Sequence, residues 1–403
     1  MKKLITLIVA CFAVATQAQT IGQLKKDMYG IASDATEGRF TASPGYLRAA
    51  NYVVARLKAD GLKPRLQSVP FIWDNYSGSS LNIKGHQYPH TAANFIVLQL
   101  GQAKKGKWLV LAPGDSLKGK AAGIILLPDA NQRKDWETTV IRQYRFGYMH
   151  YLPDGMPAQQ GVPTIIVSPL LAQNLNSGDS VTVTLKHRRE NQMGYNVIAL
   201  LPGTNPKLRH QTIVIGAHLD HIGRIGNHIY NGANDDASGC VAELGAAKVL
   251  ANPRTARPVM FAFFCGEELN LKGSRWFNAH LPIPAKDILM SINLEQLGSK
   301  HRSFHGVWAL GDTTYQQVFF SSGKGFSRKD LEFSPTDSVK EILSNTDSYS
   351  FMNNGIPSLL LGSGGFDEHH TPEDKISLID FPHLRKASLL LIQLIRQIAD
   401  HQL

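Results

Sequence analysis

The stretch FAFFCGEELN, residues 261–270, determines how the rest of the sequence is interpreted. Its first five residues are apolar, as in a strand that is buried on both faces of a sheet. A glycine then precedes two adjacent acids, Glu267 and Glu268, where the strand would end. Because open α/β sheets bind ligands outside the carboxyl ends of their strands, these acids mark a candidate site.

Similar apolar segments recur in the second half of the chain: NVIALLPG (196–203), QTIVIGAH (211–218), ILMSINLEQLG (288–298) and PSLLLGSGG (357–365). Helical patterns lie between them, such as ASGCVAELGAAKVLAN (237–252), and another ends the chain. Continuous apolar strands that alternate with helices predict an α/β fold with a mostly parallel central sheet and helices on both faces.

A β-rich segment and an N-terminal leader interrupt this pattern. Short apolar pieces between Gly, Asp and Pro fill the region from about 75 to 190. The N-terminal MKKLITLIVACFAVATQAQT has the charged, apolar and small-residue order of a secretory signal. We therefore expect a signal peptide at 1–18, a catalytic domain at 19–74 and 193–403, and a β-rich insert at 75–192.

Composition excludes several classes of protein. The 403 residues are 43% hydrophobic and 18% charged, which is typical of a globular chain. The formal charge of +10 comes from scattered Lys and Arg, so no nucleic-acid partner is expected. Cys240 and Cys265 alone cannot form a disulfide framework. No later apolar run suits a transmembrane anchor, so we expect a periplasmic or extracellular protein, with lipidation of Cys11 as a weaker alternative.

Acids and histidines follow the other expected strands as well. They are His218, Asp220, His221, Asp235, Asp236, Glu295, His369 and His370. Each alone has an ordinary explanation, such as an aspartate that caps a helix. At one sheet edge, however, the carboxylates would repel one another and raise each other's pKa unless a divalent cation lay between them. Histidines and carboxylates without cysteine are typical of an open, catalytic zinc site.

The paired glutamates at 267 and 268 suit hydrolysis at such a site. Two metal ions roughly 3.5–4 Å apart share a bridging carboxylate and activate a water for attack at neutral pH. Hydrolysis then needs a further acid that is not a ligand, to act as general base. One glutamate of the pair would bind metal and the other would take the proton.

Five motifs resemble, in their order, the co-catalytic zinc peptidase family that includes bacterial leucyl aminopeptidases, glutamate carboxypeptidase II and glutaminyl cyclases. They are AHLD (217–220), GANDDASG (232–239), FFCGEELNLKGS (263–274), INLEQLG (292–298) and HTPED (370–374). TEGRFTASPG (36–45) is also similar to a segment of these enzymes. The resemblance implies two Zn²⁺ ions per chain, and the β-rich insert resembles a protease-associated domain.

The resemblance also implies a role for each candidate residue. His218 and Glu295 would serve separate metals, Asp235 would bridge them, Glu268 and His370 would complete the two sites, and Glu267 would be the base. Asp220 would orient His218, and Asp236 would shape the turn after the bridging residue.

The sequence departs from the family pattern at three places. Glu295 stands where the family usually has aspartate, which puts the occupancy of the second metal in question. In SNTDSYSF (344–351), Asp347 is followed by serine instead of histidine, and Tyr349 is a candidate oxyanion or substrate contact. His369 replaces a frequent aromatic residue, so the choice of His370 as ligand depends on the Thr-Pro that follows it.

The leading hypothesis is an exported zinc aminopeptidase that acts on peptides with a free N-terminus. A glutaminyl cyclase of the same fold would use a single zinc, and the second aspartate of GANDDASG argues against it. A carboxypeptidase would need basic residues for the terminal carboxylate, such as Arg275, His301 or Arg302. A non-enzymatic binding module is disfavoured because every donor position is retained.

Overall fold

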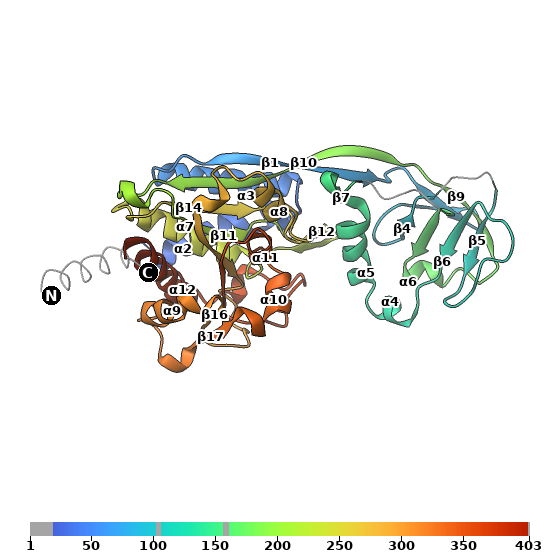
Figure 1. The fold of residues 1–403 in the computed structure, drawn as a ribbon. Coiled ribbons are helices and arrows are strands. Elements are labelled where there is room, and N and C mark those ends of the chain that lie inside the picture. The colour runs from blue at the N-terminus through green and yellow to red at the C-terminus, as the bar shows by residue number, and fades with distance from the viewer. Residues whose placement is uncertain (1–18, 102–105, 156–160, 402–403) are drawn as a thin grey trace, which may run out of the picture. The chain divides into compact units, whose positions relative to one another are not determined.

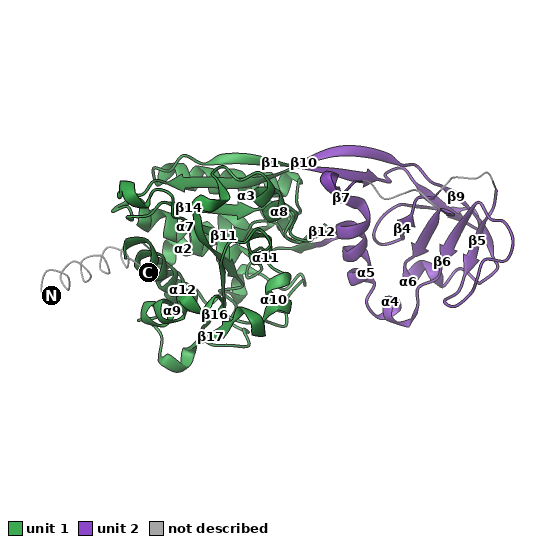
Figure 2. Cartoon of the chain, in the orientation of Figure 1, with its two compact units in different colours: residues 1–69, 194–224, 229–403 green, residues 70–193, 225–228 purple. Residues whose placement is uncertain are grey.

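The structure is a computed structural model that describes residues 19–101, 106–155 and 161–401. The expected signal peptide and Cys11 lie outside these residues. The chain divides into two compact units (Figure 2): unit 1 comprises residues 1–69, 194–224 and 229–403, and unit 2 comprises 70–193 and 225–228. None of the helices in the described residues is both long and apolar enough to cross a membrane.

Eight strands of a nine-stranded sheet lie wholly or partly in unit 1 (Figure 1), and the ninth, the edge strand β7, belongs to unit 2. The strand order is β17-β16-β18-β15-β11-β14-β10-β1-β7. In chain order the strands are β1 (Arg65–Asn75), β7 (Met149–Tyr151), β10 (Arg188–Leu201), β11 (Thr212–His218), β14 (Val259–Phe264), β15 (Ile288–Glu295), β16 (Val307–Gly311), β17 (Leu331–Pro335) and β18 (Ser358–Gly362). Strands β14, β11, β15 and β18 are mutually parallel. The pairs β10–β14 and β16–β18 are antiparallel.

The central strands are buried on both faces, which explains their continuous apolar sequences. Every residue of β11 and of β14 is buried. On one face Met260 and Phe264 pack with Phe277 and Phe351. Within the residues that the structure describes, the α-helices of this unit are α2 (Ile21–Ala32), α3 (Pro44–Ala59), α7 (Ala237–Ala251), α8 (Lys272–Ala279), α9 (Gln316–Ser322), α10 (Lys340–Ser344), α11 (Ser348–Met352) and α12 (Phe381–Asp400). Helices on both faces of a mostly parallel centre confirm the predicted fold class.

Unit 2 contains a separate seven-stranded sheet of order β3-β2-β9-β5-β6-β8-β4. Its strands are β2 (Ser80–Ile83), β3 (His86–Pro89), β4 (Phe95–Gln99), β5 (Trp108–Leu111), β6 (Gly123–Leu126), β8 (Thr164–Val167) and β9 (Ser180–Thr184). Its helices are α4 (Ala130–Lys134), α5 (Trp136–Gln143) and α6 (Pro169–Ala172). One apolar cluster that includes Trp108, Ile125 and Tyr148 forms its core, so the unit has the hydrophobic centre of an independent domain.

Candidate metal centre

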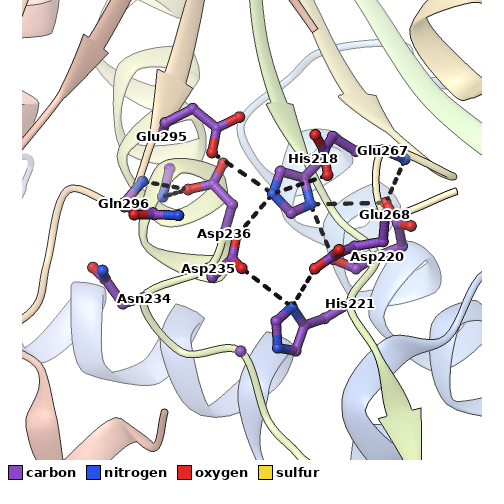
Figure 3. Close-up of polar contacts among 12 residues, drawn as sticks. His218, Asp220, His221, Asn234, Asp235, Asp236, Glu267, Glu268, Glu295 and Gln296 are labelled. Carbon is purple, nitrogen blue, oxygen red and sulfur yellow. Dashed lines mark hydrogen bonds and ion pairs between the residues drawn. The ribbon is translucent and has the colours of Figure 1, made fainter. Parts of the chain in front are cut away.

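The acids and imidazoles of unit 1 meet where the parallel strands end (Figure 3). His218 is the last residue of β11, and Glu295 is the last residue of β15. Glu267 follows β14 after Gly266, whose φ of 65° lies in the left-handed region that favours glycine. Asp235 stands two residues before α7. The carboxyl edge therefore brings together side chains that are far apart in the sequence.

A first donor group forms around His218, with Asp236 and Glu295. The Nε2 atom of His218 lies 3.1 Å from Asp235 Oδ1 and 3.8 Å from Glu295 Oε2. This proximity differs from the expectation that His218 and Glu295 serve separate metals. The reason is that β11 and β15 are adjacent parallel strands in which Gly216 pairs with Asn293, so both strands end at the same level.

A second donor group contains Asp235, Glu268 and His221, all of them buried. His221 Nδ1 lies 2.8 Å from Glu268 Oε1, and His370 Nε2 lies 3.2 Å from the same oxygen. His370 Nε2 is also 3.3 Å from Asp235 Oδ2. Asp235 thus presents one carboxylate oxygen to each group, which is the geometry of a bridging ligand. Sequence reasoning assigns no role to His221.

Burial of so many acids makes the site a good match for a divalent cation. Burial raises the pKa of Asp236, Glu267 and Glu295 well above the ordinary values. By contrast, hydrogen bonds from His218, His369 and His370 outweigh burial and lower the pKa of Asp235. Within the described residues, Asp236 Oδ2 is buried and has no hydrogen-bond partner. A cation would offset the repulsion and satisfy such oxygens.

Glu267 lies beside both groups but belongs to neither. Its Oε2 atom is 4.0 Å from His218 Nε2, and its side chain is 14% exposed, whereas that of His218 is 1% exposed. Asp220 holds its backbone, because Asp220 Oδ1 accepts the Glu267 N–H at 3.2 Å. The other oxygen of Asp220 accepts from Thr41 at 2.8 Å, and Thr41 accepts the Gly266 N–H at 2.9 Å.

The expected residues that surround the donors have specific contacts. His218 Nδ1 lies 3.1 Å from the main-chain oxygen of Asp220 and 3.8 Å from its carboxylate. Asp236 Oδ1 accepts from the Gly239 N–H at 3.1 Å and so caps α7. Tyr349 is half-buried in α11, and its contact with substrate stays a prediction. Burial raises the pKa of Asp347, just before this helix, to about 6.

Two further residues position the loop that carries Asp235. Asp374 accepts the N–H groups of Asn234 and Asp235 at 2.8 and 3.0 Å. Burial raises the pKa of Asp374 to about 7. Arg39 is completely buried and donates to main-chain oxygens of Leu219 and Gly232 at 2.7 and 2.9 Å. Both residues lie in the family-like motifs HTPED and TEGRFTASPG, and that is the only sequence signal for them.

Comparison with known proteins relates the second half of the chain to one family. Residues 196–395 match the model of Peptidase family M28. A probable leucine aminopeptidase 2 of Aspergillus oryzae is 27% identical over 199 residues, which are 46% of this chain and 37% of that protein. The probable lipoprotein aminopeptidase LpqL of Mycobacterium tuberculosis is 25% identical over 319 residues, which are 72% of this chain and 61% of that protein.

A solved structure extends the similarity to nearly the whole chain. The zinc aminopeptidase BSAP from Bacillus subtilis matches with a TM-score of 0.70 at 17% identity and covers 95% of this chain and 96% of that one. At this identity the match shows a shared fold. The chain itself spans 37% and 61% of the lengths of the two relatives above. Residues 196–395 therefore match peptidase family M28, in agreement with the co-catalytic metallopeptidase family that the motifs of this chain resemble.

Proposed function

We propose that this protein is an exported zinc-dependent aminopeptidase that releases residues from peptides with a free N-terminus. The observation that carries the proposal is a pair of donor groups connected by Asp235, which belongs to the second group and contacts His218 of the first at 3.1 Å. Glu267, an acid outside both groups, lies 4.0 Å from His218. The names of the relatives point to the same reaction, since both are described as aminopeptidases. We propose His218, Asp235, Glu268, Glu295 and His370 as ligands of two zinc ions.

Each side chain then has one task. When bound, the zinc ions would polarise the scissile carbonyl and activate water for attack. Glu267 would take the proton from the attacking water and pass it to the leaving amine. Asp220 and Thr41 hold the backbone of Gly266 and Glu267, and so keep this carboxyl in place. His221 would orient the carboxylate of Glu268, since its Nδ1 lies 2.8 Å away.

Export and the insert belong to the same proposal. The sequence of residues 1–18 has the order of a secretory signal, and one relative is described as a probable lipoprotein aminopeptidase. We propose that the mature chain begins at Gln19 and acts in the periplasm or outside the cell. We further propose that residues 75–192 form a protease-associated-like domain without catalytic residues.

A peptide assay tests the activity. Mature protein is incubated with peptides whose ends are free, acetylated or glutamine, with and without a chelator, and the products are identified by mass spectrometry. Loss of single N-terminal residues from free peptides only, abolished by the chelator, is expected. Glu267→Gln should lower kcat by roughly 10²–10⁴-fold with unchanged zinc content. Equal cleavage of acetylated peptides, or loss of ammonia from the glutamine peptides alone, would reject the aminopeptidase.

A further inference from the structure

Two consecutive histidines direct their rings at the same carboxylate oxygen. His369 Nε2 lies 3.1 Å from Asp235 Oδ2, and His370 Nε2 lies 3.3 Å from that atom. The two rings are stacked, with centroids 3.8 Å apart and an angle of 26° between their planes. Asp235, His369 and His370 form a donor group of their own, in which one ligand atom of each lies within 4.8 Å of the others.

The loop backbone produces this arrangement. Neighbouring side chains in an extended segment point to opposite faces, but His370 has a φ of 57°, in the left-handed region. The turn is held by the Thr371 N–H, which donates to Glu368 O at 3.1 Å. The Glu368 side chain contacts His301 Nδ1 at 2.5 Å and so ties the loop to the segment after β15. Both rings therefore lie on the same side of a fixed turn.

His369 combines an exposed position with a buried target. Its side chain is 44% exposed, whereas that of Asp235 is 3% exposed. A histidine with only a surface role has no need to reach a buried carboxylate. A neutral imidazole beside a carboxylate and a second imidazole is, however, a common ligand set for zinc.

We propose that His369 is an additional ligand of the ion that Asp235, Glu268 and His370 would hold. This inference rests on the proposed zinc site but not on the reaction. It gives that ion four protein donors, two imidazoles and two carboxylates, one more than the three of a typical catalytic zinc site, so this ion would be the more tightly held. The ion beside His218 would then have the open coordination position. The two sites would differ in zinc affinity, and His369 would be the residue that causes this difference.

The test measures metal affinity directly. Mature, zinc-loaded protein and the variants His369→Ala and His369→Phe are titrated with a competing chelator, and bound zinc is counted by mass spectrometry. In both variants, the affinity for one of the two zinc ions should fall by more than about 100-fold. This exceeds the roughly 10–100-fold loss that is typical when a residue only hydrogen-bonds a metal ligand. His301→Ala is the matched control, because it removes a contact of the same loop and no donor.

X-ray absorption at the zinc edge gives an independent readout. Three imidazoles for two zinc ions are expected in the wild type, from His218, His369 and His370, and two in His369→Ala. Circular dichroism of the metal-free variants shows whether the fold is intact. Wild-type affinity and an unchanged imidazole count in both His369 variants would overturn the inference. A failed peptide assay with weakened zinc binding in these variants would reject the proposed function alone.

Discussion

Removal of the buried guanidinium of Arg39 should weaken the metal centre without touching a metal ligand. Arg39 Nε donates to Leu219 O at 2.7 Å, Nη2 donates to Gly232 O at 2.9 Å, and Nη1 donates to Asn231 O. These oxygens belong to the loop that follows His218 and to the loop that carries Asp235. Arg39 thus holds the loops at a fixed separation.

The expected cost follows from these contacts. A hydrogen bond to a charged group contributes about 1.5–3 kcal/mol, and three of them do not add fully. Arg39→Met also relieves the cost of a buried cation, so we expect a net loss of about 3–5 kcal/mol in the free energy of unfolding. Zinc affinity should fall roughly 10–100-fold, because the loops would relax around the ligands.

Chemical denaturation in excess chelator measures the loss in the free energy of unfolding. Chelator competition on the refolded protein measures the loss of zinc affinity. Arg39→Lys keeps the charge but not the planar set of donors, so its losses should be intermediate. Arg48→Met is the control, since the Arg48 side chain is 47% exposed and contacts the exposed carboxylate of Glu37. This substitution should lower the free energy of unfolding by less than about 1 kcal/mol. Equal stability and equal zinc affinity for Arg39→Met and wild type would refute the argument.

Three further predictions concern buried groups. Burial raises the pKa of Glu243, which accepts the Ala262 N–H at 2.8 Å. The free energy of unfolding should therefore fall as pH rises above about 4.3. Unfolding curves measured at a series of pH values should show that Glu243→Gln removes this pH dependence. Hydrogen bonds from two imidazoles outweigh burial and lower the pKa of Asp74. Its stabilisation should be lost as pH falls below about 3.9, and Asp74→Asn should flatten the acid-unfolding curve of unit 2. Burial also raises the pKa of the thiols Cys240 and Cys265, so a thiol reagent should label them only after denaturation.

The buried strands and their terminal donors were predictable because both depend on local sequence. An uninterrupted apolar run such as TIVIGAH specifies a strand covered on both faces, and its last residue falls at the carboxyl edge. The pairing of His218 with Glu295 was not predictable. It depends on β15 lying next to β11 while β14 lies on the other side, an order that the sequence does not reveal.

The contributions of Arg39 and Asp374 were missed for a similar reason. Arg39 contacts Leu219, which is 180 positions away, and Asp374 contacts Asn234 across 140 positions. Their partners are main-chain groups, which every residue carries, so no complementary side chain marks the other end of either contact. Direct side-chain donors could be found from their residue types, whereas residues that hold loops by backbone contacts could be found only by resemblance to the family.

The shared carboxylate of Asp235 has a consequence for how the proposed metal sites fill. Its Oδ1 lies with His218, and its Oδ2 lies with His369 and His370, so the first ion to bind would fix the orientation of a ligand of the second. The same ion would reduce the repulsion among acids whose pKa burial raises, such as Glu295. Protons compete for these carboxyls and imidazoles, so zinc affinity must fall as pH falls. The first ion would therefore have two opposite effects on the affinity for the second. It would orient Asp235 to bind the second ion, but its positive charge would repel that ion. If Asp235 bridges the two ions as proposed, its negative charge would reduce that repulsion, because one of its oxygens would face each ion.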